Sequence, residues 1–145
     1  DNGEVLWTTS MEKGRMPFIL QQFKWGKWVD VLRVDGQGGP EEKTYSVRVD
    51  PVAGINQLRL SHVGADGQRI TKGEVSFHSD SPALEWNHDR DGQKIQFSKK
   101  TQFEIVDTFG NVVMRGHGDE AILRYLARGE YFVNFGARSE TLKKR

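Results

Sequence analysis

The chain has 145 residues, and its 21 Lys and Arg nearly balance its 20 Asp and Glu. This balance excludes the strongly basic surface that a nucleic-acid-binding module normally carries, so we expect no nucleic-acid partner. The chain contains no cysteine, which excludes disulfides, thiol nucleophiles and cysteine-ligated metal centres. No apolar run approaches the roughly 20 residues that span a bilayer as a helix, so we expect no membrane insertion.

The first residues, Asp1–Glu4, lack the basic-then-apolar order of a signal peptide, and the sequence does not open on methionine. This is what we expect of a processed or trimmed mature chain. The feature weakly favours export.

The first half of the chain alternates apolar and polar residues with the period of two that is typical of β-strands. The alternation predicts that Phe18 and Leu20 face a core, with Phe23 as a further candidate, and that either Val31 or Leu32 does the same. The predicted strands are Glu4–Ser10, Pro17–Lys24, Trp28–Val34, Tyr45–Asp50, Asn56–Val63, and a last one with Ile70 and Glu74–Phe77.

The alternation breaks at Ser79–Pro82 and then restarts, which predicts one domain over residues 1–78 and a second over 79–145. In the second half, Asp107–Asn111 is a strong hairpin-turn signal, because Gly and Asn tolerate left-handed backbone. Ile122–Leu126 fits a helical turn or a strand, and we favour a strand followed by a loop. The predicted strands are Ala83–Trp86, Lys94–Phe97, Gln102–Asp107, Asn111–Arg115, Ala121–Arg124, Glu130–Phe135 and Ser139–Lys143.

Short strands separated by turn signals roughly every 8–12 residues are typical of antiparallel sandwiches. We therefore predict an all-β chain that forms two small tandem antiparallel β-sandwich domains of the immunoglobulin or fibronectin type. Helix is expected to be a minor component at most, because no stretch before Ala121 sustains apolar residues at helical spacing.

Several spaced motifs of the first half occur in an order known from one family. Trp7-Thr8-Thr9-Ser10-Met11-Glu12 comes first, a strand opening with Phe18 follows, and Gly54–Leu60 and Val63–Gln68 come last. This order resembles the fibronectin type III-like module of proteins exported by the type IX secretion system. There the pattern runs W-T-T-x-x-E, a strand opening with F, G-x-N-x-Y-R-L and V-D-x-D-G-K. Leu58 stands where that module usually has Tyr.

The second half is similar to the C-terminal sorting domain that follows this module in the same proteins. Phe103–Val113 resembles its V-x-I-Y-D-x-x-G-x-x-V hairpin, and Leu126–Val133 resembles its L-P-x-G-x-Y-x-V strand. Thr141–Arg145 resembles its basic final strand, whereas its opening Y-P-N-P is reduced to Ser81-Pro82. The residues that carry the sorting-like motif are Asp107, Gly110, Asn111, Gly129, Tyr131, Lys143 and Lys144.

The two resemblances imply an exported bacterial protein, or a fragment of one, that is secreted or held at the cell surface, in the periplasm or at the outer membrane. They imply a surface or adhesion module whose last domain is recognised by the outer-membrane secretion machinery or by other envelope proteins. An alternative, favoured by the shortened opening motif and by a final strand that lacks the usual run of Val or Ile before Lys, is a retained accessory component of the type IX secretion or gliding machinery.

Catalytic and metal motifs are absent from the sequence, so we expect no enzyme, no cofactor and no metal site. The chain has four histidines, and no two of them stand at a metal-type spacing. We expect His62 in a strand, and His88 and His117 in solvated turns. Asn87–Gly92 matches the first half of a calcium loop, but Ser98 stands where the bidentate Glu belongs, so a plain β-turn is preferred.

Two tryptophans flank a tight turn in the segment Trp25-Gly26-Lys27-Trp28. We expect Trp28 to pack inward and Trp25 to be the more exposed of the two. Aromatic rings beside lysines bind carbohydrate or protein partners through stacking and cation–π contacts. Trp25 is therefore a candidate ligand contact, and a carbohydrate-binding module that takes a glycan is the remaining alternative.

Overall fold

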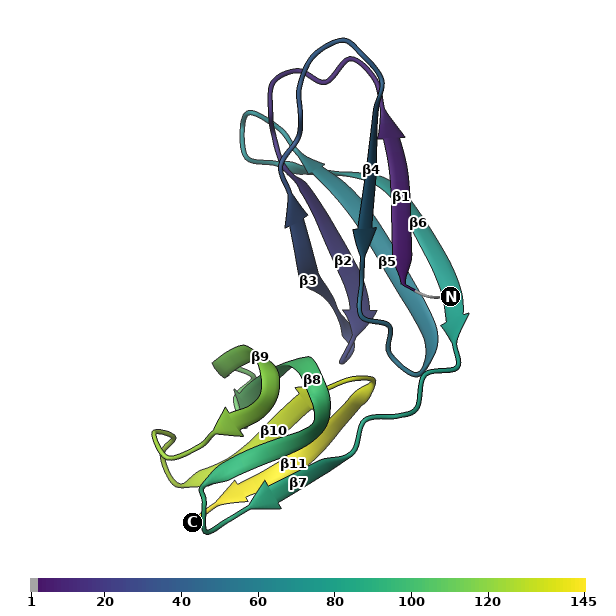
Figure 1. The fold of residues 1–145 in the computed structure, drawn as a ribbon. Helices are drawn as coiled ribbons and strands as arrows, with labels where there is room; N and C mark the ends of the chain where they lie inside the picture. Colours follow the sequence, from purple (N-terminus) through teal and green to yellow (C-terminus); the bar gives the residue numbers. More distant parts are fainter. Residues whose placement is uncertain (1–2) are drawn as a thin grey trace. The chain divides into compact units, whose positions relative to one another are not determined.

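The computed structural model describes residues 3–145, which form eleven strands and no helix (Figure 1). The expected all-β class is confirmed, because the strands build several antiparallel sheets. Nothing in the described part of the chain is a helix capable of crossing a membrane. Contacts divide the chain into two compact units, which we call unit 1, ending at Ser81, and unit 2, Pro82–Arg145. The division falls slightly after the predicted boundary, since the last strand of unit 1 continues to Ser79.

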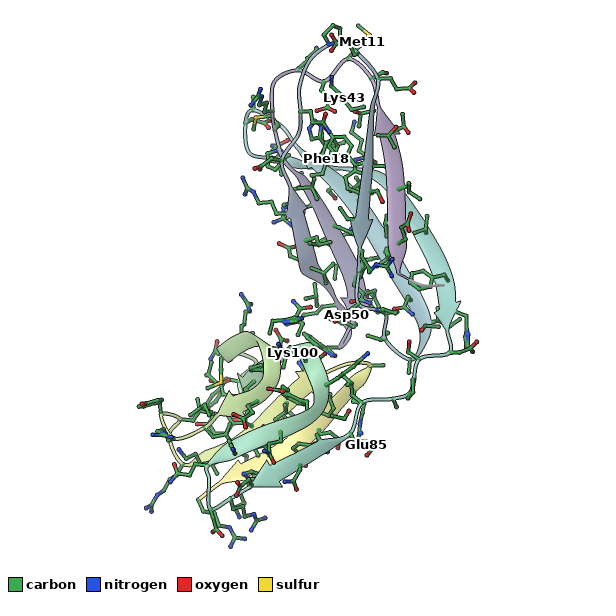
Figure 2. All side chains as sticks on the ribbon, viewed as in Figure 1. Met11, Phe18, Lys43, Asp50, Glu85 and Lys100 are labelled. Atoms are coloured by element: carbon green, nitrogen blue, oxygen red, sulfur yellow. The ribbon has the colours of Figure 1, made fainter. Side chains whose placement is uncertain are left out.

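Unit 1 is a sandwich of two antiparallel sheets of unequal width (Figure 1). The narrow sheet pairs β1 (Glu4–Thr9) with β4 (Lys43–Arg48). The wide sheet has the order β3-β2-β5-β6, with β3 Lys27–Val34, β2 Phe18–Lys24, β5 Gly54–Val63 and β6 Arg69–Ser79. Leu20, Val49 and Leu58 form the closed part of its core, and Phe18 also points between the two sheets (Figure 2).

A bulge in β3 decides which apolar residues of this hairpin reach the core. Leu20 pairs with Leu32 while Gln21 pairs with Asp30, so Val31 is an extra residue. An extra residue bends the strand locally and interrupts the alternation. Val31 and Leu32 consequently both pack against the core, where the alternation allowed only one of them.

The prediction that Phe23 faces the core is wrong. Phe18, Leu20 and Gln22 share the inner face of β2 because they alternate, and Gln22 is only 1% exposed. Phe23 has the opposite parity, is 40% exposed, and meets the ring of Trp28 edge-on at 5.3 Å. A two-residue period excludes Phe23 from the face that holds Phe18 and Leu20.

The last predicted strand of the first half, with Ile70 and Glu74–Phe77, is β6, which runs without a break from Arg69 to Ser79. Gly73 interrupts the apolar pattern without ending the strand, and it pairs with Leu60. Ser61 pairs with Thr71, which leaves Lys72 as the extra residue of a second bulge. Two bulges thus account for most of the irregular alternation in unit 1.

Unit 2 is one sheet that folds over itself. Its strands are β7 (Trp86–Asp89), β8 (Lys94–Asp107), β9 (Val112–Ile122), β10 (Gly129–Phe135) and β11 (Arg138–Lys144). The first residues of β8 pair with β7, its last residues pair with β10, and β9 accompanies both halves. The pairing with β9 is irregular between Gln96 and Thr101, and the two halves of β8 contribute Ile95 and Phe103 to one core.

Three strand predictions in unit 2 are corrected. Ala83–Trp86 is wrong, because the first strand starts only at Trp86. The four segments expected between Lys94 and Arg124 are two long strands, β8 and β9. The Gly-rich segment expected to separate Asn111–Arg115 from Ala121–Arg124 is part of β9 and stays extended next to the core. A Cβ on Gly116 would come within 2.7 Å of the Phe103 ring, so glycine there permits close packing. After β9, residues 123–128 form a loop, as favoured from the sequence.

Candidate functional site

The sorting-like residues begin at the turn that joins β8 to β9. Asp107 Oδ1 accepts hydrogen bonds from the backbone N–H groups of Phe109 (2.9 Å) and Asn111 (2.8 Å). The Asn111 side chain donates to Oδ2 at 3.2 Å, and Gly110 takes a left-handed φ of 88°. The bonds from Asn111, ahead of those from Phe109 and Gly110, lower the pKa of Asp107. These residues form a self-capped turn.

Strand pairing brings the remaining motif residues to the same end of the sheet. Asp107 is opposite Tyr131, which is opposite Leu142. Gly129 is opposite Lys144, and the neighbouring Lys143 is opposite Glu130. The seven residues are therefore gathered at the end of the sheet where β8 and β11 finish and β10 starts, which we call the motif end.

Several motif residues hold the loop of residues 123–128 in place. The hydroxyl of Tyr131, a residue only 8% exposed, donates to the Ala127 carbonyl at 2.6 Å. Lys144 Nζ donates to the carbonyls of Leu123 (2.5 Å) and Leu126 (2.8 Å). Tyr131 and Lys144 thus stabilise the fold of the unit, and Lys143 alone of the two final motif lysines is exposed.

Exposed aromatic and basic side chains surround the motif end. Phe109, at the tip of the turn, is 88% exposed, and Tyr125, in the loop before Gly129, is 84% exposed. Arg128, three residues after Tyr125, and Lys143, opposite Glu130 in β11, are also exposed. Exposed aromatic rings together with basic groups favour binding of a protein or peptide partner.

Trp25 and Gly26 form the two-residue turn between β2 and β3, both with positive φ (58° and 77°). That geometry belongs to the hairpin turns in which Asn-Gly is usual, so Trp25 is an uncommon residue there. Trp25 and Trp28 are both half-buried, so the expected contrast in their exposure is not seen. Lys24 Nζ lies 4.7 Å from the Trp25 ring, and the Arg59 guanidinium lies 4.3 Å from the Trp28 ring.

Each of the four histidines lies in a different strand. His62 lies in β5 as expected, stacks on Phe18 at 4.3 Å and contacts the Met16 carbonyl at 3.2 Å. His88 and His117 were expected in turns but lie in β7 and β9. Burial, ahead of the charge of Arg90, lowers the pKa of His88. No group of three metal-ligating side chains occurs among residues 3–145.

The candidate calcium loop, Asn87–Gly92, splits between β7 and the turn after it. Asp89 Oδ1 accepts from the Gly92 N–H at 2.9 Å, so this carboxylate caps the turn. A Cβ on Gly92 would meet the same carboxylate at 2.5 Å. The arrangement is that of a β-turn between β7 and β8.

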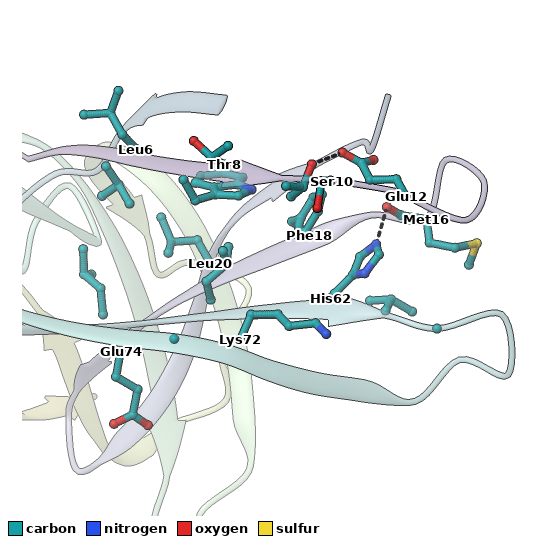
Figure 3. A pocket seen from close by; sticks show the side chains of 18 of the residues that line it. Leu6, Thr8, Ser10, Glu12, Met16, Phe18, Leu20, His62, Lys72 and Glu74 are labelled. Carbon is teal, nitrogen blue, oxygen red and sulfur yellow. Dashed lines mark hydrogen bonds between the residues drawn. The ribbon is translucent and has the colours of Figure 1, made fainter. Parts of the chain in front are cut away.

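A groove of about 760 Å³, which no sequence motif indicated, lies in unit 1 between β1 and β6 (Figure 3). Leu20 and Leu58 lie on its floor, and its walls come from β1, β6 and the segment after β1. Trp7 also lines the groove and stacks on Tyr45 at 5.1 Å. Its buried Nε1 has no hydrogen-bond partner within the described residues.

Glu12 closes one end of this groove. Its carboxylate, buried in the protein, accepts hydrogen bonds from Thr9 Oγ1, from Tyr45 Oη (2.6 Å) and from the Gly38 N–H (3.0 Å). Burial by itself raises the pKa of Glu12, but these bonds together outweigh it and the pKa is lowered. Burial and the Glu12 contact raise the pKa of Tyr45. The Glu of the W-T-T-x-x-E pattern therefore anchors the segment after β1.

Two lysines near the Glu12 end carry charge without a partner. Lys13 follows Glu12 in the chain, and Lys72 extends from the β6 bulge toward the end that holds Glu12 and His62 (Figure 3). Neither has a hydrogen bond or ion pair with any other described residue. The sequence held no signal for this arrangement, because residues 13 and 72 come to line one groove only in the folded sandwich.

Neither a scan of protein-family models nor a search of curated proteins finds a match to this chain.

Proposed function

We propose that this chain is a non-catalytic binding protein exported by a bacterium, and that the outer-membrane secretion machinery recognises unit 2 at the motif end. The observation that carries the proposal is the gathering of the seven sorting-like residues, from Asp107 to Lys144, at one end of one sheet.

The motif end offers a partner two kinds of contact. β11 is an edge strand, and an edge strand pairs readily with an added strand. The exposed Phe109, Tyr125 and Lys143 supply apolar and basic contacts next to it. Asp107 and Tyr131 act indirectly, because they hold the turn and the loop that present these side chains.

The test uses the full chain fused to a carrier protein in a bacterium that has a type IX secretion system. A triple variant, Phe109→Ala, Tyr125→Ala and Lys143→Ala, should leave the carrier in the periplasm, whereas the unchanged chain delivers it to the surface. The matched control is Lys99→Ala with Lys100→Ala, which alters exposed residues in the middle of β8. Equal surface delivery by the triple variant and the control would overturn the proposal.

A second candidate function, a retained accessory component of the type IX secretion or gliding machinery, is favoured by the segment between the units. Ser79 is 3% exposed, and its Oγ accepts from the Ser81 N–H at 3.2 Å, which limits the access of a protease at Ser79 itself, whereas Asp80, Pro82 and Ala83 are exposed. Mass spectrometry of the native protein separates the two functions. An intact terminus at Arg145 supports retention, whereas loss of the residues after about Ser79 supports sorting with cleavage.

A further inference from the structure

We propose that the groove between β1 and β6 binds an extended polypeptide strand that is donated in trans, enters antiparallel to β1 and begins with an acidic residue. This inference concerns unit 1 and is independent of the function proposed for unit 2.

Part of the inner face of the wide sheet is uncovered at β6. Val75 pairs with Leu58, and opposite residues of an antiparallel pair point to the same side of a sheet. Leu58 is 1% exposed, but Val75, which faces the same side, is 55% exposed. The wide sheet has four strands and the narrow sheet has two, and the inner side of β6 stays open around Val75, whereas Phe77 further along β6 packs against the core. A third strand beside β1 would provide that cover.

One backbone edge of β1 has no strand paired to it among the described residues. Gly3 O accepts from Val49 N at 2.7 Å, which identifies Gly3 and Val49 as a hydrogen-bonded pair of the ladder. Because such pairs alternate along an antiparallel ladder, the N–H and C=O groups of Leu6 and Thr8 point away from β4. Among the described residues β4 is the one strand that pairs with β1. A β-strand satisfies such a row of groups, whereas a lipid or a small apolar ligand does not.

The charge at one end of the groove favours an occupant that carries an acidic group. Lys13 and Lys72 lie without partners near the Glu12 end, whereas the Glu12 carboxylate is already occupied by three donors. An occupant with an acidic group at this end would neutralise the lysines. Antiparallel pairing is more common and slightly more stable than parallel pairing. An antiparallel occupant enters at the Thr9 end of β1, so its acidic residue precedes its apolar positions.

The test uses the full chain and a capped synthetic peptide, Asp-Glu-Val-Thr-Val-Thr-Val-Lys, followed by amide NMR. We expect saturable binding with protection of the Leu6 and Thr8 amides from hydrogen exchange. A peptide of the same composition with its three valines adjacent is the matched control, and it should bind at least about tenfold more weakly, since alternation is lost. Absence of binding at about 1 mM peptide, or equal binding of the two peptides, would overturn the proposal.

Two variants locate the binding. Leu6→Pro removes the N–H that faces the groove and no bond to β4, so it should abolish binding, whereas Leu6→Thr keeps the N–H and should retain it. Lys13→Glu combined with Lys72→Glu should lower the affinity for the acid-first peptide by about tenfold and raise the affinity for a peptide beginning Lys-Lys. If Leu6→Pro fails to fold, the charge-reversed variant still tests the proposal. The proposal is contradicted if this variant prefers the acid-first peptide as strongly as the unchanged chain does. Self-association of the chain through Leu6 and Thr8 would also overturn it, by assigning the groove to a second copy.

Discussion

Unit 1 and unit 2 are both small antiparallel structures, but they close their cores to different degrees. Eleven buried hydrophobic residues form one cluster in unit 2, whereas the described part of unit 1 has seven, three of them in its central cluster. The β8–β9 hairpin supplies residues to the unit 2 core from both of its halves. In unit 1 two strands oppose four, and inward-facing Val75 remains exposed. The exposed inner-face Val75 thus marks the core of unit 1 as more open than that of unit 2.

The largest effect is expected from Phe135→Ala in unit 2. Phe135 is 0% exposed and packs against Phe97 and Trp86, so its removal leaves a cavity that closed surroundings cannot fill. We expect a loss of about 3–5 kcal/mol in the free energy of unfolding of unit 2, measured by urea denaturation followed by NMR. Phe132→Ala, in the same strand but 41% exposed, is the control and should cost far less.

Leu58→Ala tests the open core of unit 1. Leu58 is as buried as the core residues of unit 2, but the groove next to it lets neighbours and water adjust. We expect the free energy of unfolding of unit 1 to fall by about 2–3 kcal/mol in the same denaturation measurement, which is near the lower end of the range for buried Leu→Ala substitutions. A cost equal to that of Phe135→Ala would contradict the difference between an open and a closed core.

Tyr45→Phe removes one hydrogen bond from the Glu12 carboxylate and leaves the packing intact. We expect unit 1 to lose about 1–2 kcal/mol and the pKa of Glu12 to rise toward its ordinary value. Because the folded-state pKa of Glu12 is lowered, its stabilising contribution is present above the unfolded-state pKa and is lost as the pH falls. An NMR titration checks the pKa, and an unchanged value would show that the hydrogen bond is not its cause.

Asp107→Asn tests the turn at the motif end. The pKa of Asp107 is lowered, so the ionised side chain stabilises unit 2 above the unfolded-state value of 3.8, and this contribution is lost on acidification. The variant should unfold at lower urea concentration than the unchanged chain at pH 7, and the two should converge as the pH falls below about 4. Parallel pH profiles for the two proteins would assign the effect to another carboxylate.

The smallest effect on stability is expected from Trp25→Asn. Asn-Gly suits the left-handed backbone of this turn, which offsets the lost contact between Lys24 and the Trp25 ring. We expect a change below about 1 kcal/mol in the free energy of unfolding. A glycan array run on both proteins tests the carbohydrate hypothesis, which fails if no glycan distinguishes the variant from the unchanged chain.

Alternation along the chain was sufficient to predict most strands, including Tyr45–Asp50 and Glu130–Phe135 to within a few residues of β4 and β10. It failed at Phe23, at the strand proposed for Ala83–Trp86, and at glycines such as Gly116 that were taken as strand ends. A local pattern cannot reveal that Gly116 lies against Phe103, because that contact depends on the pairing of β8 with β9.

By itself the sequence determined the all-β class and the hairpin turn at Asp107–Asn111, since each depends on a few neighbouring side chains, and it carried the resemblance that singles out the seven motif residues. Only the tertiary structure decided that these residues meet at one end of a sheet, and that Lys13 and Lys72 line the same groove. The physical reason is that strand order and uncovered edges arise from pairing between segments far apart in the chain, and residue patterns carry no direct record of that pairing.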